Sequence, residues 1–133
     1  MPAATADDLA GIPLFDTLEP EERATIAPWF ELQAVSSGIN LTGEGAAGYS
    51  FFVLRDGTAT VRVDGSEVRT LEPGAFFGEL ALLGEGRRTA TVTTASQAKV
   101  LVLFGTEFRR LQQEYPALAS RIESALRETG RAA

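Results

Sequence analysis

One stretch of the chain, residues 76–92, holds residue types suited to binding an anion, and it reads FFGELALLGEGRRTATV. Gly78 lets the backbone bend and approach a ligand closely, because it carries no Cβ atom. The apolar segment over residues 80–83 is expected to form a helical turn that includes Glu79 at its start, and the first N–H groups of a helix have no partner within it. Because such N–H groups suit a phosphate, we expect an anion site at the backbone of residues 78–81.

Two charged side chains in this stretch could complete the site. Arg88 can donate two parallel hydrogen bonds to the same anion. Glu79 would repel a phosphate, so its carboxylate is expected to face away and accept hydrogen bonds from a neutral hydroxyl, such as that of a ribose. The alternatives are a surface charge for Arg88 and a helix-dipole interaction for Glu79. A phosphate with a sugar hydroxyl beside it indicates a nucleotide.

The same residues resemble the phosphate-binding cassette of cyclic nucleotide-binding domains. The family pattern is F-G-E-[LI]-A, a short spacer and R-[ATS]-A-[TSN]-V, and this chain has FGELAL over 77–82 and RTATV over 88–92. The resemblance extends over about residues 9–126. A motif of this length and mixed chemistry is far more specific than a lone G-x-G-x-x-G.

The resemblance implies a cyclic nucleoside monophosphate as ligand, with cAMP ahead of cGMP, and a regulatory role. Ligand binding would move the C-terminal helix, and that movement would be the signal. The phosphate would bind the backbone of residues 78–81 and the arginine, while the ribose hydroxyl would bind the glutamate. The residues implied in these contacts are Gly78, Glu79, Leu80, Ala81 and Arg88.

Other positions match the family pattern less directly. Thr89 is permissive for cGMP, because threonine at this place occurs in cGMP-responsive members, although channels that prefer cAMP carry it too. Val61 and Val63 match positions that line the sugar and base, and the alternative is that they belong to the core. Arg87 stands where the family often has proline, so a solvated side chain is expected there.

The rest of the chain predicts a mainly β protein with flanking helices, a β jelly-roll barrel, because short β-prone runs are separated by Gly, Asp, Asn and Pro. A loose N-terminus is expected over residues 1–8 and a single domain over 9–133. Within it we expect a helical cap over 9–30, the barrel over 31–104 and C-terminal helices over 105–130.

Local signals place several elements. Strands are expected over 48–54, 58–63, 67–71, 89–94 and 99–104. The Asp-Gly pairs at 56–57 and 64–65 are turn signals. Pro20, with two acidic residues after it, predicts a helix start, Thr106 is a candidate N-cap, and Pro116 is expected to end one helix and begin the next.

The last helix carries an apolar stripe formed by Leu118, Ile122 and Leu126. This stripe could be a lid over the base, part of the core, or a partner face. An exposed stripe would support a homodimer, whereas a stripe packed on the barrel would not. Arg121 and Arg127 are the polar lid candidates.

Composition limits the function further. The 133 residues have a net charge of −6 with no histidine and no cysteine. An acidic chain is poorly suited to bind nucleic acid by itself, and the usual transition-metal ligands and triad base are missing. No apolar run is long enough to span a bilayer, so no membrane insertion is expected, and the cytoplasm is the default location.

The sequence predicts no enzyme. Glu79 and Glu85 are a candidate pair of acid–base carboxylates, but a ribose contact and a loop position explain them better. Two alternatives stay open: the effector half of a truncated transcription factor of the catabolite-activator type, and an interaction module without a ligand. An intact Glu79 and Arg88 argue against the second. The sequence does not identify the effector, which could be a separate protein or a fused domain.

Overall fold

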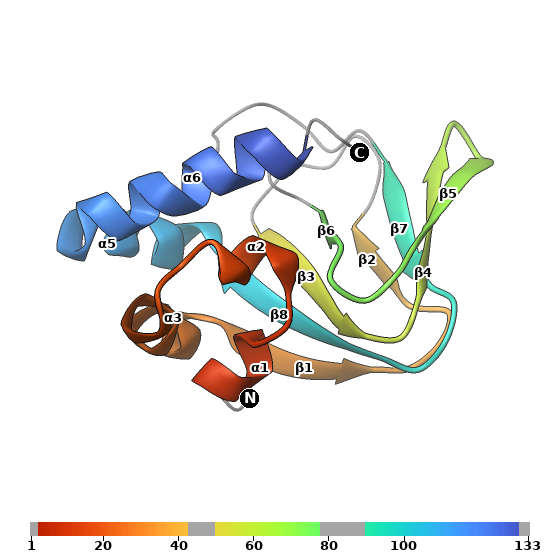
Figure 1. The fold of residues 1–133 in the computed structure, drawn as a ribbon. Coiled ribbons are helices and arrows are strands. Elements are labelled where there is room, and N and C mark those ends of the chain that lie inside the picture. Colours follow the sequence, from red (N-terminus) through yellow and green to blue (C-terminus); the bar gives the residue numbers. More distant parts are fainter. Residues whose placement is uncertain (1–2, 43–49, 78–89, 131–133) are drawn as a thin grey trace.

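The structure is a computed structural model that describes residues 3–42, 50–77 and 90–130 (Figure 1). Four short helical segments precede the strands, and two longer helices follow them. The helical segments are α1 (Ala6–Leu9), α2 (Pro13–Asp16), α3 (Pro20–Ile26), η1 (Ala27–Trp29), α5 (Gly105–Glu114) and α6 (Pro116–Gly130). The strands are β1 (Glu31–Val35), β2 (Asn40–Thr42), β3 (Ser50–Asp56), β4 (Ala59–Val63), β5 (Ser66–Leu71), β6 (Phe76–Phe77), β7 (Thr91–Thr94) and β8 (Ala98–Phe104).

The strands form two four-stranded antiparallel sheets. One sheet has the order β1-β8-β3-β6 and the other has the order β2-β7-β4-β5. The helices gather beside the first sheet, with α5 and α6 at one end of the molecule and the β4–β5 hairpin at the other (Figure 1). The expected mainly β fold with flanking helices is confirmed.

The two central strands of the first sheet, β3 and β8, are buried on both faces. Along β3, Phe51 and Val53 pack with the helices, whereas Leu54 packs between the two sheets. Along β8, Leu101 and Leu103 likewise pack with the helices, while its alternate residues face the second sheet. Two-sided burial explains why β8 is an almost unbroken apolar run in the sequence. These two strands therefore connect a helix-side core to an inter-sheet core.

The N-terminal segment contacts the start of the first sheet. Ala4 is 3% exposed, and its N–H donates to the carbonyl of Phe30 at 3.0 Å. Thr5 and Asp8 form a capping box at the start of α1. Ala3 and Ala4 are thus paired with the start of β1, and the expectation of a loose segment over residues 1–8 stays a prediction.

The helix starts agree with the sequence in two of three places. Pro20 begins α3 and Pro116 begins α6, as predicted. Thr106 is not the N-cap of α5: the helix begins at Gly105, and Phe104 occupies the cap position. Within the described ranges, every helix is too short or too polar to cross a lipid bilayer.

The Asp64–Gly65 pair forms the predicted turn. Val63 pairs with Ser66, so two residues join β4 to β5. Asp64 has a φ of 52° and Gly65 a φ of 78°. Positive φ at both central residues is the geometry that a two-residue hairpin of this type requires, and Asp-Gly is well suited to it.

A buried hydroxyl fixes the turn between β1 and β2. The Thr94 hydroxyl donates to the carbonyl of Ser36 at 2.6 Å and accepts from the N–H of Ile39 at 2.9 Å. Thr94→Val keeps the shape of this buried side chain but removes both hydrogen bonds to the turn backbone, so we expect the free energy of unfolding to fall by about 2 kcal/mol. Urea denaturation would measure this loss.

The matched control is the same substitution at the neighbouring residue. Thr93 donates to the Asn40 side chain in an exposed contact at 2.6 Å, so Thr93→Val should cost less than about 1 kcal/mol. Equal losses for the two variants would contradict the role given to Thr94.

Candidate functional site

Most of the predicted contact residues fall in one segment that the structure does not describe. Gly78, Glu79, Leu80, Ala81, Arg88 and Thr89 lie outside the described residues, as do Glu85 and Arg87. Val61 and Val63 are described, and so are the residues on both sides of this segment. The position of the candidate site therefore follows from its flanks and from β4.

The segment begins at the edge of the first sheet. Phe77, the last described residue before it, pairs with Phe52 on β3. The two rings stack, with centroids 5.0 Å apart and an angle of 12° between their planes. Phe77 is buried in the inter-sheet core. Stacking and burial together fix the chain at the point where the motif starts.

The segment ends in the second sheet. Ala90 packs against the inter-sheet core, and Val92 on β7 is buried within it. Val92 pairs with Val61 on β4. Because Phe77, Val61 and Val92 belong to the same core, both ends of segment 78–89 are held at one place between the two sheets.

The two valines of β4 have different surroundings. Val61 is 6% exposed and lies in the inter-sheet core. This agrees with the alternative interpretation of Val61 as a core residue. Val63 is half-buried, two residues further along the same strand face. The structure thus places Val61 directly beside the final valine of the motif, Val92, and leaves Val63 partly accessible at the strand end.

The C-terminal apolar stripe packs within the chain. Leu118 and Ile122 are buried in the helix-side core together with Phe108 and Leu111 of α5. The side chain of Leu126 lies outside the described residues. Leu118 and Ile122 therefore pack inside the chain and are not exposed. This packing gives no support to a homodimer formed through the stripe.

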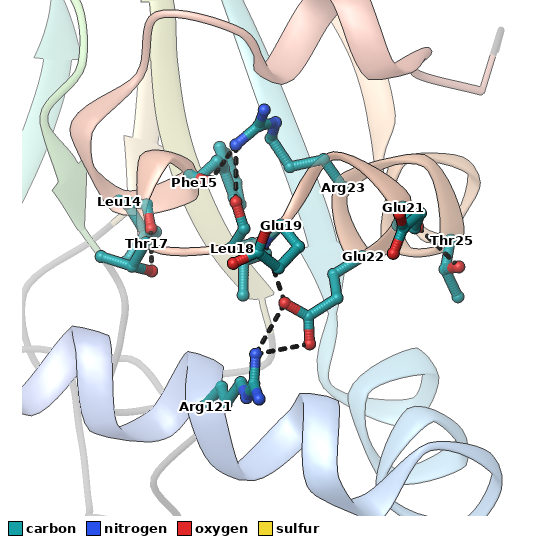
Figure 2. Close-up of polar contacts among 10 residues, drawn as sticks. All are labelled: Leu14, Phe15, Thr17, Leu18, Glu19, Glu21, Glu22, Arg23, Thr25 and Arg121. Atoms are coloured by element: carbon teal, nitrogen blue, oxygen red, sulfur yellow. Dashed lines mark hydrogen bonds and ion pairs between the residues drawn. The ribbon is translucent and has the colours of Figure 1, made fainter.

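One polar contact ties α6 to the N-terminal helices. Arg121, a lid candidate, donates through Nη1 to both carboxylate oxygens of Glu22 at 2.8 Å (Figure 2). Glu22 also accepts the backbone N–H of Glu19 at 2.9 Å and so caps α3. Arg23, on the next position of α3, donates to the carbonyls of Phe15 and Leu18 at 3.2 and 2.7 Å. These contacts link α2, α3 and α6 into one unit. The side chain of Arg127, the other lid candidate, lies outside the described residues.

Sequence analysis did not identify Glu22 as a partner of α6. Its place in the first turn of a helix indicated only a favourable interaction with the helix N-terminus. The two residues are 99 positions apart, and no local pattern connects them. Charge complementarity between two separate helices becomes visible only when the fold is known.

We expect Glu22→Gln to loosen α6 without unfolding the chain. Glutamine can still accept the N–H of Glu19, because a capping box tolerates Glu or Gln at this position. The variant therefore removes mainly the charge facing Arg121. The pair is exposed enough that the cost in unfolding free energy should stay below about 1 kcal/mol, while hydrogen exchange in α6 should become faster.

Glu21→Gln is the control for this prediction, since Glu21 is an exposed neighbour with no ion pair among the described residues. Unchanged exchange in α6 for Glu22→Gln, or the same acceleration in both variants, would show that the Arg121–Glu22 pair does not hold the helix.

Comparison with known proteins agrees with this arrangement. A model of the family described as "Cyclic nucleotide-binding domain" matches residues 32–115. The cAMP-dependent protein kinase regulatory subunit of Neurospora crassa is 39% identical over 123 residues, which cover 91% of this chain and 30% of that protein. The chain belongs to the cyclic nucleotide-binding domain family.

Solved structures of this kind show the same fold. A cAMP-bound PfPKA-R structure is 29% identical, with a TM-score of 0.73 over 94% of this chain and 46% of that one. The N-terminal domain of a transcriptional regulator from Streptomyces coelicolor A3(2) is 27% identical, with a TM-score of 0.78 over 95% and 94% of the two chains. The chain thus spans less than a third of the Neurospora relative but nearly all of the Streptomyces domain.

Proposed function

We propose that the chain is a regulatory sensor that binds a cyclic nucleoside monophosphate, cAMP ahead of cGMP. The observation that carries the proposal is the position of the motif's two ends. Phe77 and Val92 belong to one core together with Val61, so the described residues that flank segment 78–89 lie together between the two sheets, next to β4. The relatives named for cAMP, and the cAMP-bound PfPKA-R structure, support cAMP as the first ligand to test.

By analogy with the family motif, residues 78–81 and Arg88 would hold the ligand. The backbone N–H groups of residues 78–81 would bind the cyclic phosphate together with the Arg88 guanidinium. The Glu79 carboxylate would accept the ribose hydroxyl. Val63 would contact the sugar or base at the strand end, where its side chain is half-buried. Val61 would act indirectly. It pairs with Val92 and so positions β7, the strand that follows Arg88 in the chain.

The output would be a change in the position of α6. This helix packs into the helix-side core and is held on α3 by Arg121 and Glu22. Strands β3 and β8 contribute to both cores, so they give a physical connection between the ligand site and α6. A ligand shifts the equilibrium toward the arrangement in which it makes more contacts. The effector would be a separate protein or a fused domain, and a kinase catalytic chain is the first candidate given the relatives.

A second candidate is the effector half of a transcription regulator. The Streptomyces structure supports it, since that structure is the N-terminal domain of such a regulator and matches this chain over nearly its whole length. Both candidates require the same ligand site and differ in what α6 acts on. The full reading frame around this chain would separate them.

Thermal unfolding with and without ligand tests the proposal. A ligand present at 100 times its dissociation constant stabilises the folded state by about 2.7 kcal/mol, which for a chain of this size raises Tm by roughly 10 °C. We expect this rise with cAMP, a smaller rise with cGMP at equal concentration, and little change with 5′-AMP. Absence of a shift with either cyclic nucleotide, or an equal shift with 5′-AMP, would contradict the proposal.

Thr89 gives a separate prediction about the base. If its hydroxyl bonds to guanine, Thr89→Ala removes one neutral hydrogen bond, worth about 1 kcal/mol, from the cGMP complex. We expect cGMP affinity to fall about fivefold while cAMP affinity changes little. Competition binding against a fluorescent cyclic nucleotide would measure both. An equal loss for the two ligands would place the hydroxyl on the phosphate instead.

A further inference from the structure

A groove lies between α3 and the junction of α5 and α6, away from strand β4 and the ends of segment 78–89. Its volume is about 410 Å³, which is within the range of ligand-binding pockets. One wall comes from α3 and the other from the end of α5 and the start of α6. The lining residues that matter below are Glu21, Glu22, Thr25, Glu114, Tyr115 and Leu118.

The floor of the groove is apolar and held in place. Tyr115 is 45% exposed, although it is a large aromatic residue. Its N–H donates to the carbonyl of Leu111 at 2.7 Å, and its own carbonyl accepts the N–H of Ala119 at 3.0 Å. Pro116 follows with a fixed φ, and Leu118 closes the floor. An exposed tyrosine on a constrained backbone loses little conformational entropy when a partner covers it.

The rim of the groove is acidic. Among the described lining residues there are three carboxylates and no basic side chain. Glu22 is engaged by Arg121, and Glu114 lies 3.7 Å from Arg110. Glu21 is exposed and forms no ion pair within the described part of the chain. The Thr25 hydroxyl donates to the carbonyl of Glu21, so it is already used.

These features together define the chemistry of an occupant. An acidic rim attracts a basic side chain, and the apolar floor accepts a large apolar one. A second copy of this chain is a poor candidate, since each copy carries a net charge of −6. A small cation would leave the apolar lining residues exposed, and an apolar peptide would leave Glu21 without an ion-pair partner among the described residues.

We propose that this groove docks a segment of another protein in which an arginine or lysine stands beside a leucine or a similar apolar residue. The basic side chain pairs with Glu21 at the rim, and the apolar side chain packs on Tyr115 and Leu118. Tyrosine and arginine are the residue types that most often dominate such contacts. The lining residues include none of those proposed to bind nucleotide, and the test below uses the chain without nucleotide, so it can succeed or fail separately from the proposed function.

The test is a titration of the ¹⁵N-labelled chain, without nucleotide, with the acetylated peptide Gly-Leu-Arg-Arg-Leu-Gly amide. We expect amide chemical shifts to change around residues 21–25 and 114–118. The same peptide with glutamate for both arginines, and one with alanine for both leucines, should bind much more weakly. Absence of shifts, or shifts centred elsewhere, would overturn the proposal.

Two variants and one control sharpen this test. Glu21→Lys and Tyr115→Ala change exposed residues, so the fold should persist, and each should weaken peptide binding by about tenfold. Glu67→Lys makes the same change in net charge on β5, at the opposite end of the molecule from α5 (Figure 1). An equal loss in Glu67→Lys would reveal non-specific charge attraction and overturn the assignment to the groove.

Discussion

Replacing Arg88 with alanine should weaken cAMP binding by on the order of 100-fold while the fold stays intact. In the proposed complex the Arg88 guanidinium donates two hydrogen bonds to the cyclic phosphate, and each bond to a charged group is worth about 1.5 to 3 kcal/mol. Loss of both accounts for a change of this size, because each 1.4 kcal/mol is a factor of ten. Calorimetric titration of the variant against the unchanged chain measures the ratio directly.

Arg87→Ala is the matched control, since it removes the same charge one position earlier in the chain. A solvated arginine contributes only through screened attraction, so its loss should change affinity by less than about fivefold. Circular dichroism should show both variants folded. Equal affinities for Arg88→Ala and the unchanged chain would remove the main contact of the proposed site.

Gly57→Ala should cause the largest loss of stability, about 3 to 5 kcal/mol. Gly57 has a φ of 89°, a conformation that other residues adopt only with strain. A Cβ atom here would also meet the backbone of the β7–β8 connection: the Gln97 carbonyl oxygen, and the Cα of Ala98 at 2.9 Å. Backbone atoms held in a sheet yield little, so the contact adds a packing cost to the strain. Urea denaturation would measure the sum.

Gly65→Ala separates these two costs. Gly65 has a similar φ of 78°, but a Cβ atom there would meet nothing within 4 Å. Only the conformational cost remains, so the loss should be about 1 kcal/mol. If the two variants lost equal stability, the close approach of Gly57 to the β7–β8 connection would contribute nothing to the loss in unfolding free energy.

The fold could be predicted where the signals are local. The Asp64–Gly65 hairpin and the start of α6 at Pro116 depend on backbone preferences of one or two residues, and both are found in the structure. Strand β6 has only two residues, too few for a periodic pattern, and it was not predicted. The hydrogen bond from the Ala4 N–H to the Phe30 carbonyl joins residues 26 positions apart, and composition does not reveal such a contact.

The candidate site also has a part that the sequence could indicate and a part that only the fold reveals. Its motif is contiguous in sequence, so residue types and spacing alone identified it. The pairing of Val61 with Val92 brings together residues 31 positions apart, and only the family resemblance indicated Val61 beforehand. The contact between Arg121 and Glu22, and the groove beside it, arise from helices at opposite ends of the chain. No local signal predicts such contacts.

The most direct test of the central claim is calorimetric titration of the unchanged chain with cAMP, with cGMP and 5′-AMP alongside. We expect one site per chain, with a micromolar or tighter Kd for a cyclic nucleotide and far weaker binding of 5′-AMP, which lacks the cyclic phosphate. Absence of binding to both cyclic nucleotides would contradict the account and leave a jelly-roll domain that works through its surface alone.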